Sequence, residues 1–197
     1  NKGHEGVIEP GGVQWMTAAG GIVHSEMPEQ EDGLMSGFQL WVNLPKAEKM
    51  KPAAYQEYDE AGVPADKGEG VTAKIIAGRT GAGVEGPVTG VTVEPFYAEL
   101  RMDPGAMFEE AIGDEKTAFA AVHSGSVRTG GVSLSEAMLG VYGPGKTIRL
   151  TAGPDGARVM LAAAKPIGEP IVQGGPFVMT TEGEVRQAML DYQQGRF

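Results

Sequence analysis

The sequence predicts an all-β protein built as a barrel or a sandwich. Thirty-one Gly and 13 Pro accompany only 7% aromatic residues in a chain of 197, which is typical of many short strands joined by tight turns. Alternation of apolar and polar residues recurs along the chain, whereas helical periodicity over three turns is rare. The hydrophobic content of 41% is enough for a sizeable core, so one large or two small domains are expected.

The first predicted strands lie on either side of a turn of small residues. Residues 14–16 and 22–27 have strand-like sequence, and the Ala and Gly residues at 18–21 join them. On the second strand His24 and Glu26 are two apart, so they point to the same face. An imidazole next to a carboxylate is a ligand mix suited to iron, manganese or zinc. For an isolated pair, a solvated strand face or an ordinary His–Glu contact is the alternative interpretation.

Longer strings around this pair resemble the pirin family of two-barrel cupins. They read VQWMTAAGGIVHSEMP at residues 13–28, GFQLWVNLP at 37–45 and EPIVQGGPFVMTT at 169–181. The similarity covers nearly the whole chain and is least distinctive in the middle. It implies two cupin, jelly-roll-like β-barrels in tandem, the first incomplete, followed by a short C-terminal helix.

The next predicted strand spans residues 38–44 and has apolar side chains on one face. Pro45 ends it, because proline cannot donate a hydrogen bond to a sheet ladder. Trp15 and Trp41 either fill the core or line a ligand cavity.

A domain boundary is expected after this strand. Residues 46–70 contain Pro and several charges and are predicted to form an extended crossing loop and linker. We therefore assign residues 1–66 to the C-terminal part of the first, metal-binding barrel with its linker. Residues 67–197 form the second barrel with the C-terminal helix.

The second barrel contains several predicted strands separated by Gly, Pro or Asp turns. They span residues 71–76, 96–102, 118–127, 136–142, 148–152 and 157–164. In residues 96–102 the alternation places Phe96, Ala98, Leu100 and Met102 inward, and Tyr97, Glu99 and Arg101 outward.

Residues 181–194 are predicted to form a helix. Thr181 and Glu184 have the spacing of a capping box, and Gly195 is a stop signal. An apolar stripe provides a packing face on Val185, Ala188, Met189 and Tyr192.

The second barrel is predicted to be free of metal. The usual cupin His-x-His position after Met102 is occupied by PGAMFE at residues 104–109. His123 has no second His or paired acid at useful spacing, and His4 is expected to be an exposed loop residue.

Composition excludes several classes of partner and site. The formal net charge of −10 opposes direct nucleic-acid binding, which depends on clustered Lys and Arg. The absence of Cys excludes disulfides and thiolate metal sites and fits a cytoplasmic protein. Neither a membrane span nor a secretory leader is expected, because no apolar run of about 18 residues occurs.

The resemblance to pirins also implies a metal in the first barrel, usually iron, held by three His and one Glu. His24 and Glu26 match the third His and the Glu, so Fe(II) is the expected cofactor, with other divalent transition metals as alternatives. In the family the other two ligands come from an earlier His-x-His strand. The sequence opens on Asn1 without Met, so we expect residues upstream and expect residues 1–197 by themselves to be inactive.

Two functions are implied by the family. Several pirins are quercetin 2,3-dioxygenases, which implies an iron dioxygenase acting on quercetin-like flavonols or a related small aromatic substrate. Glu26 would then also be the base that removes the substrate hydroxyl proton. The alternative is a non-enzymatic, iron-containing regulator that acts through protein partners, as a transcriptional co-regulator or a modulator of metabolic enzymes. The acidic charge is compatible with protein partners.

Overall fold

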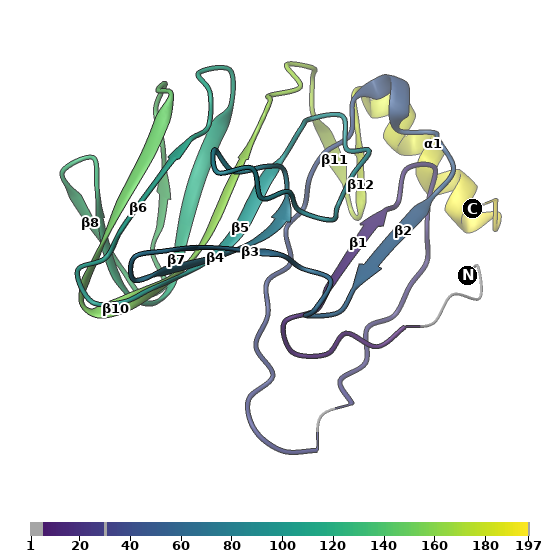
Figure 1. Ribbon diagram of the computed structural model, residues 1–197. Coiled ribbons are helices and arrows are strands. Elements are labelled where there is room, and N and C mark those ends of the chain that lie inside the picture. Colours follow the sequence, from purple (N-terminus) through teal and green to yellow (C-terminus); the bar gives the residue numbers. More distant parts are fainter. Residues whose placement is uncertain (1–5, 30, 197) are drawn as a thin grey trace. The chain divides into compact units, whose positions relative to one another are not determined.

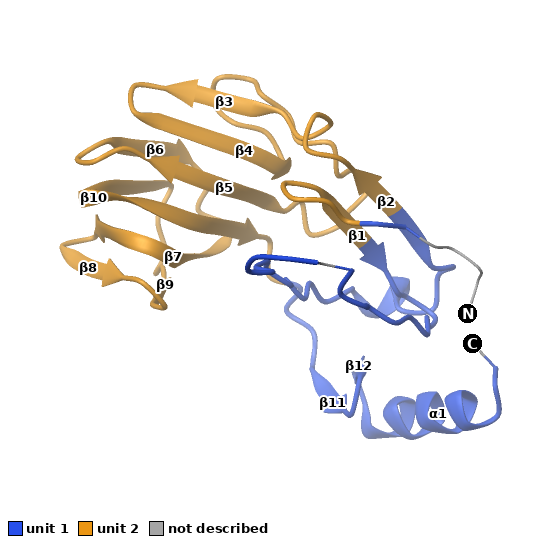
Figure 2. Ribbon diagram, turned by 90° about the horizontal axis from the view of Figure 1, so that it is seen from below, with its two compact units in different colours: residues 1–7, 16–55, 167–197 blue, residues 8–15, 56–166 orange. Residues whose placement is uncertain are grey.

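The chain divides into two units in the computed structural model, which describes residues 6–29 and 31–196 (Figure 2). Unit 1 comprises residues 1–7, 16–55 and 167–197, and unit 2 comprises residues 8–15 and 56–166. The predicted domain boundary after residue 66 stays a prediction.

Strands make up most of the regular structure, and a short helix follows them near the C-terminus (Figure 1). In chain order the elements are β1 (Val13–Thr17), the 3-10 helix η1 (Lys46–Glu48), β2 (Ala54–Tyr58), β3 (Ala65–Gly68), β4 (Val71–Ala77), β5 (Phe96–Met102), β6 (Met107–Ala111), β7 (Thr117–Thr129), β8 (Val132–Ser135), β9 (Leu139–Val141), β10 (Thr147–Ala164), β11 (Val172–Gly174), β12 (Phe177–Met179) and α1 (Glu182–Gln193). The all-β prediction is confirmed. No helix in the described part of the chain is long and apolar enough to cross a membrane.

Unit 2 is built on an antiparallel sheet in the order β3-β4-β5-β10-β7-β8, and β6 and β9 pair with β10 and β7. The long strand β10 is central to it, because it pairs with β5, β6 and β7. Its register places Val159 opposite Leu100 and Leu161 opposite Ala98. Apolar side chains on neighbouring strands therefore meet on one face of the sheet.

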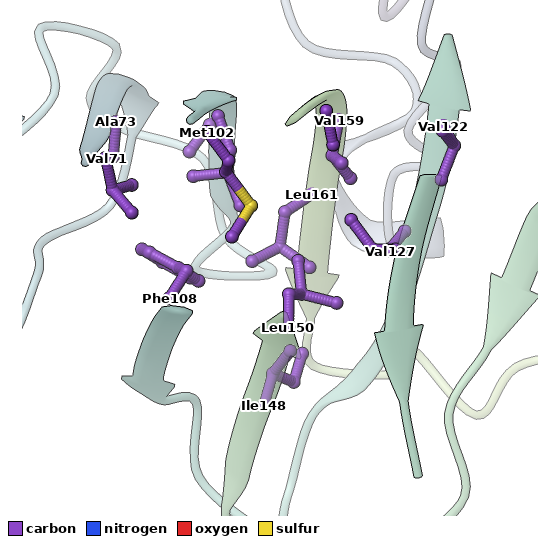
Figure 3. Packing of buried hydrophobic residues seen from close by; sticks show 14 of the residues in the cluster. Val71, Ala73, Met102, Phe108, Val122, Val127, Ile148, Leu150, Val159 and Leu161 are labelled. Carbon is purple, nitrogen blue, oxygen red and sulfur yellow. The ribbon is translucent and has the colours of Figure 1, made fainter. Parts of the chain in front are cut away.

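That face carries the hydrophobic core (Figure 3). The largest fully buried side chains are Ile75, Leu100, Leu150, Leu161, Val127 and Val159. The predicted inward residues of β5 are all buried, so the alternation read from residues 96–102 is confirmed on that face.

Tyr97 was expected to point to solvent, and this prediction is wrong. It is 8% exposed, and burial raises the pKa of its hydroxyl to about 12. Its register partner Ala162 and the β4 residue Ile76 are also buried, so this end of the second sheet face is covered. Alternation identifies the face of a side chain, but not whether other residues cover that face.

The predicted turn at residues 153–156 is a bulge inside one continuous strand, β10. The register with β7 shifts between Ala152 and Ala157. Two glycines with positive φ, Gly125 and Gly156, let the strands pass closely, because a Cβ on Gly125 would lie 2.1 Å from the Gly156 carbonyl oxygen. Turn-type residues between two predicted short strands can therefore mark a bulge within one long strand.

Several other strand predictions differ from the structure. A linker was expected at residues 46–70, but this range contains the strands β2 and β3. These residues form strands because β1 pairs with β2 and β4 pairs with β3. The predicted strand at 14–16 is confirmed as β1, but residues 22–27 and 38–44 are not strands. A strand needs a neighbour to complete its ladder, and no described segment pairs with these two.

The predicted C-terminal helix is confirmed as α1. Thr181 is its N-cap, and its Oγ1 accepts a hydrogen bond from the Glu184 N–H at 3.2 Å. Val185 and Ala188 form its buried face. Gly174 of β11 faces this helix, because a Cβ there would lie 2.5 Å from Val185 Cγ1.

Candidate metal centre

His24 and Glu26 lie in unit 1, on an extended segment that follows a tight turn. Gly21 N–H donates to the Ala18 carbonyl at 2.9 Å, and Gly20 N–H donates to the Lys51 carbonyl at 3.0 Å. The positive φ of Gly21, 129°, is accessible because glycine lacks a Cβ. The chain is thus turned and anchored just before the candidate ligands.

The structure brings the two predicted ligands together. His24 Nδ1 lies 3.7 Å from Glu26 Oε1, and their side chains are 39% and 64% exposed. The distance is too long for a hydrogen bond, so the two candidate metal ligands lie side by side and are both open to solvent. The sequence predicted that His24 and Glu26 share a face because it predicted a strand here. The two side chains do lie close together, although the segment is not a strand.

Gln39 is a third polar residue at this site. Its Nε2 donates to Glu26 Oε1 at 3.5 Å, a long contact that lies on the same carboxylate oxygen as the His24 contact. The sequence placed Gln39 on the polar face of residues 38–44, and nothing in that pattern indicated a contact thirteen residues upstream. The contact places a side-chain amide beside one oxygen of the exposed Glu26 carboxylate.

The donor chemistry of this pair fits a divalent transition metal, since imidazole and carboxylate are both ligands for such ions. Within residues 6–29 and 31–196, no group of three His, Asp or Glu lies close enough to hold a metal ion. A metal ion bound by this pair would have two of its ligands from His24 and Glu26 and would need the others from further groups.

The other residues singled out from the sequence lie elsewhere. His123 is half-buried on β7, in unit 2, at the register shift between the pairs Ser124–Arg158 and Val122–Val159. Trp15 is half-buried on β1, and Trp41 is 66% exposed, so Trp41 does not fill a core. His4 lies outside the described residues. The absence of metal from the second barrel stays a prediction.

Lys49 anchors the segment that follows Gln39. It is only 7% exposed, and its Nζ donates to Asn43 Oδ1 at 2.6 Å and to the Val178 carbonyl at 2.9 Å. Burial lowers the pKa of this amine, and the charges of Glu169 and Glu184 partly oppose that shift. No sequence pattern marks Lys49 as buried, because one of its two partners, Val178, lies 129 residues away along the chain.

Glu184 completes this polar network in unit 1. Its Oε2 accepts hydrogen bonds from the Thr180 Oγ1 at 2.6 Å and the Thr180 N–H at 3.1 Å, and its Oε1 lies 2.9 Å from Lys46 Nζ. These contacts, with the Thr180 hydroxyl contributing most, lower the pKa of Glu184 to about 2. The capping-box spacing predicted this carboxylate at the helix start, and its shortest hydrogen bond is to the hydroxyl of Thr180, one residue before the cap.

Two family models match parts of the chain. A family model described as "Pirin C-terminal cupin domain" matches residues 97–197, and one described as "Pirin" matches residues 1–42. A protein of Caulobacter vibrioides named "Pirin-like protein" is 49% identical over 199 residues, which cover 100% of this chain and 71% of the relative.

Two further proteins carry an activity in their names. A Pseudomonas aeruginosa protein, provisionally named quercetin 2,3-dioxygenase, is 42% identical over 200 residues, covering 98% of this chain and 70% of that protein. The crystal structure of a quercetin 2,3-dioxygenase from Acinetobacter baumannii superposes with a TM-score of 0.83 at 23% identity, covering 99% of this chain and 69% of that one. The second likeness is one of fold.

Proposed function

The chain belongs to the pirin family of cupin proteins, and we propose that it is a metal-dependent dioxygenase acting on a flavonol of the quercetin type. Family membership confirms the predicted all-β architecture of two cupin-type domains with a short C-terminal helix. The similar protein of Pseudomonas aeruginosa bears the name of this activity, which supports the substrate class.

The observation that carries the proposal is the open pair of His24 and Glu26. We assign both side chains as metal ligands, with Fe(II) as the ion and the remaining ligands outside this pair. When bound, such an ion supplies a redox-active Lewis acid at which flavonol and dioxygen can react. The pair provides one neutral donor and one anionic donor, and both are accessible to a substrate from solvent.

Glu26 has a second role in this scheme. A flavonol must lose its hydroxyl proton before oxygenation, and the Glu26 carboxylate can hold that proton at its free oxygen. Gln39 Nε2 lies 3.5 Å from the other oxygen, Oε1, and we assign Gln39 as a positioning residue for Glu26.

The test is iron content and oxygen uptake by the full-length protein loaded anaerobically with Fe(II). We expect oxygen consumption that depends on quercetin. His24→Ala and Glu26→Gln should each lower it by about 100-fold or more, because even residues that only hydrogen-bond to a metal ligand contribute 10- to 100-fold to activity. His123→Ala, on β7 of unit 2, is the matched control and should retain both iron and activity. Iron-loaded protein that consumes no oxygen with flavonols would contradict the proposal.

A second candidate is an iron-containing regulator that binds protein partners. It is favoured by exposed apolar side chains next to the candidate ligands in the chain, since Val23 is 43% and Met27 is 78% exposed. Exposed apolar groups beside a redox-active ion would let a partner respond to its oxidation state. Partner affinity that differs between ferric and ferrous protein, without flavonol turnover, would select this candidate over the enzyme.

A further inference from the structure

The sheet of unit 2 carries a line of cationic and hydroxyl side chains on the face opposite its core. The strand register joins them in sequence: Lys67 pairs with Thr72, Thr72 with Arg101, Arg101 with Arg158, and Arg158 with Ser124. Directly paired residues of antiparallel strands point to the same face. These five residues, from β3, β4, β5, β10 and β7, are called the basic row below.

The basic row is open to solvent. Its members are exposed except Thr72, which is half-buried, whereas the adjacent chain positions Leu100 and Val159 are fully buried on the other face. The five strands lie side by side (Figure 2). With about 4.8 Å between neighbouring strands, the row extends for about 19 Å across the sheet.

The charges of the row are not balanced within it. Arg101 bonds Glu99 on its own strand, with Nε 3.0 Å from Oε1. Among the described residues, no carboxylate lies within ion-pair distance of Arg158 or Lys67. Arg101 and Arg158 are direct cross-strand partners, and like charges in that position destabilise a sheet.

The adjacent row on the same face is closer to neutral. There Lys74 pairs in register with Glu99, and Lys74 also bonds Glu60. The protein has 26 acidic residues and a net charge of −10, so opposed arginines are not a consequence of a basic composition. These cations are in excess although like charges destabilise a sheet. Such an arrangement indicates a surface that binds an anion.

We propose that the basic row is a binding surface for an acidic segment of a partner protein. Arginine binds carboxylates through two parallel hydrogen bonds, and the hydroxyls of Thr72 and Ser124 add donors at either side of the arginine pair. An extended peptide repeats its side chains on one face about every 6.8 Å, so the row spans several acidic side chains. A nucleic acid is disfavoured, because three cations neutralise few of the closely spaced phosphates of its backbone.

The experiment is the binding of a fluorescent oligoglutamate peptide to the full-length protein at low ionic strength, followed by anisotropy. We expect Arg158→Gln and Arg101→Gln each to weaken binding about threefold, as for an exposed ion pair, and the double variant about tenfold. Added salt should weaken binding by the wild type more than by the double variant.

Arg149→Gln is the matched control. Arg149 lies on β10, is 65% exposed and is paired with Glu109, outside the basic row, so its loss changes the net charge equally. We expect it to leave peptide affinity unchanged. Iron content and oxygen uptake should be the same in all these variants, so a failure here is distinguishable from a failure of the proposed enzyme.

Three results would overturn the proposal. They are no binding of the peptide by the wild type, an equal loss for Arg149→Gln, and binding of a single-stranded oligonucleotide through the row in place of the peptide. Circular dichroism of each variant establishes that the sheet is intact, which is expected because the substituted side chains are exposed.

Discussion

The two units of this protein are stabilised by different interactions. The apolar core cluster lies wholly within unit 2, from Val71 to Ala163. In the described part of unit 1, four residues are buried: two are apolar, Val185 and Ala188, and two are polar, Lys49 and Thr180. Unit 1 depends on hydrogen bonds and ion pairs where unit 2 depends on apolar burial.

This contrast matters for function. Extended segments with little apolar burial open more readily than core strands, and they can present side chains to solvent and to ligands. His24 and Glu26 lie on such a segment in unit 1, whereas unit 2 supplies a rigid sheet whose register fixes the basic row. The unit with the weaker apolar core therefore carries the candidate metal ligands.

The largest expected effect is on the core of unit 2. Leu161→Ala removes a fully buried side chain and should lower the free energy of unfolding by about 3–4 kcal/mol, through lost burial and a residual cavity. Urea denaturation followed by circular dichroism measures it. Val141→Ala, at a site that is 69% exposed, should change stability by less than about 0.5 kcal/mol. Equal effects of the two substitutions would contradict the placement of the core.

A smaller loss is expected from the polar network of unit 1. Lys49→Ala removes the side-chain donor to the Val178 carbonyl and one of the two donors to Asn43 Oδ1, which keeps the Leu44 N–H, at a cost of about 2 kcal/mol. Hydrogen exchange should show faster opening of β12 and α1, with β10 unchanged. Lys51→Ala, an exposed control, should not alter exchange. Faster exchange in β10 would show that the two units are not separately stabilised.

The N-cap of α1 should contribute less to the free energy of unfolding than Lys49 does. Thr181→Ala removes the oxygen that accepts the Glu184 N–H and should cost about 1 kcal/mol. Thr181→Ser retains that oxygen, so it should restore stability. If both substitutions destabilise equally, the threonine acts through its methyl group and not as a cap. Thermal denaturation followed at 222 nm, together with exchange in α1, provides the measurement.

The smallest effect at neutral pH is the pH dependence contributed by Glu184. Its pKa is lowered from 4.5 to about 2 in the folded protein, so the folded state binds a proton more weakly than the unfolded state. The stabilisation of the folded state by ionised Glu184 is fully present above about pH 4.5 and is lost as the pH falls toward 2. Protection factors of the α1 amides, which correct for the intrinsic pH dependence of exchange, should fall less steeply toward low pH in Glu184→Gln than in the wild type. Identical slopes would contradict the assignment.

Local patterns predicted part of each unit. The inward residues of β5 and the cap of α1 were predicted correctly, because each depends on neighbours within a few residues. Of the predicted stripe of α1, Val185 and Ala188 are buried, whereas Met189 and Tyr192 are exposed. The strand predictions at residues 22–27 and 38–44 were wrong, and β2 and β3 were missed, because a ladder partner decides whether an extended segment becomes a strand.

For the candidate site, the spacing of His24 and Glu26 predicted that their side chains share a direction, and they do. The contact from Gln39, the burial of Lys49 and the alignment of Lys67, Arg101 and Arg158 could not be predicted. Each depends on which distant segments lie next to one another.

The sequence by itself determined the all-β class, the family and the pair of candidate ligands, since composition, motif and spacing are properties of the linear chain. Only the tertiary structure decided which charges are buried and which are aligned across strands. Register is a non-local property: a shift of one residue in β10 would move Arg158 to the opposite face of the sheet and remove the basic row.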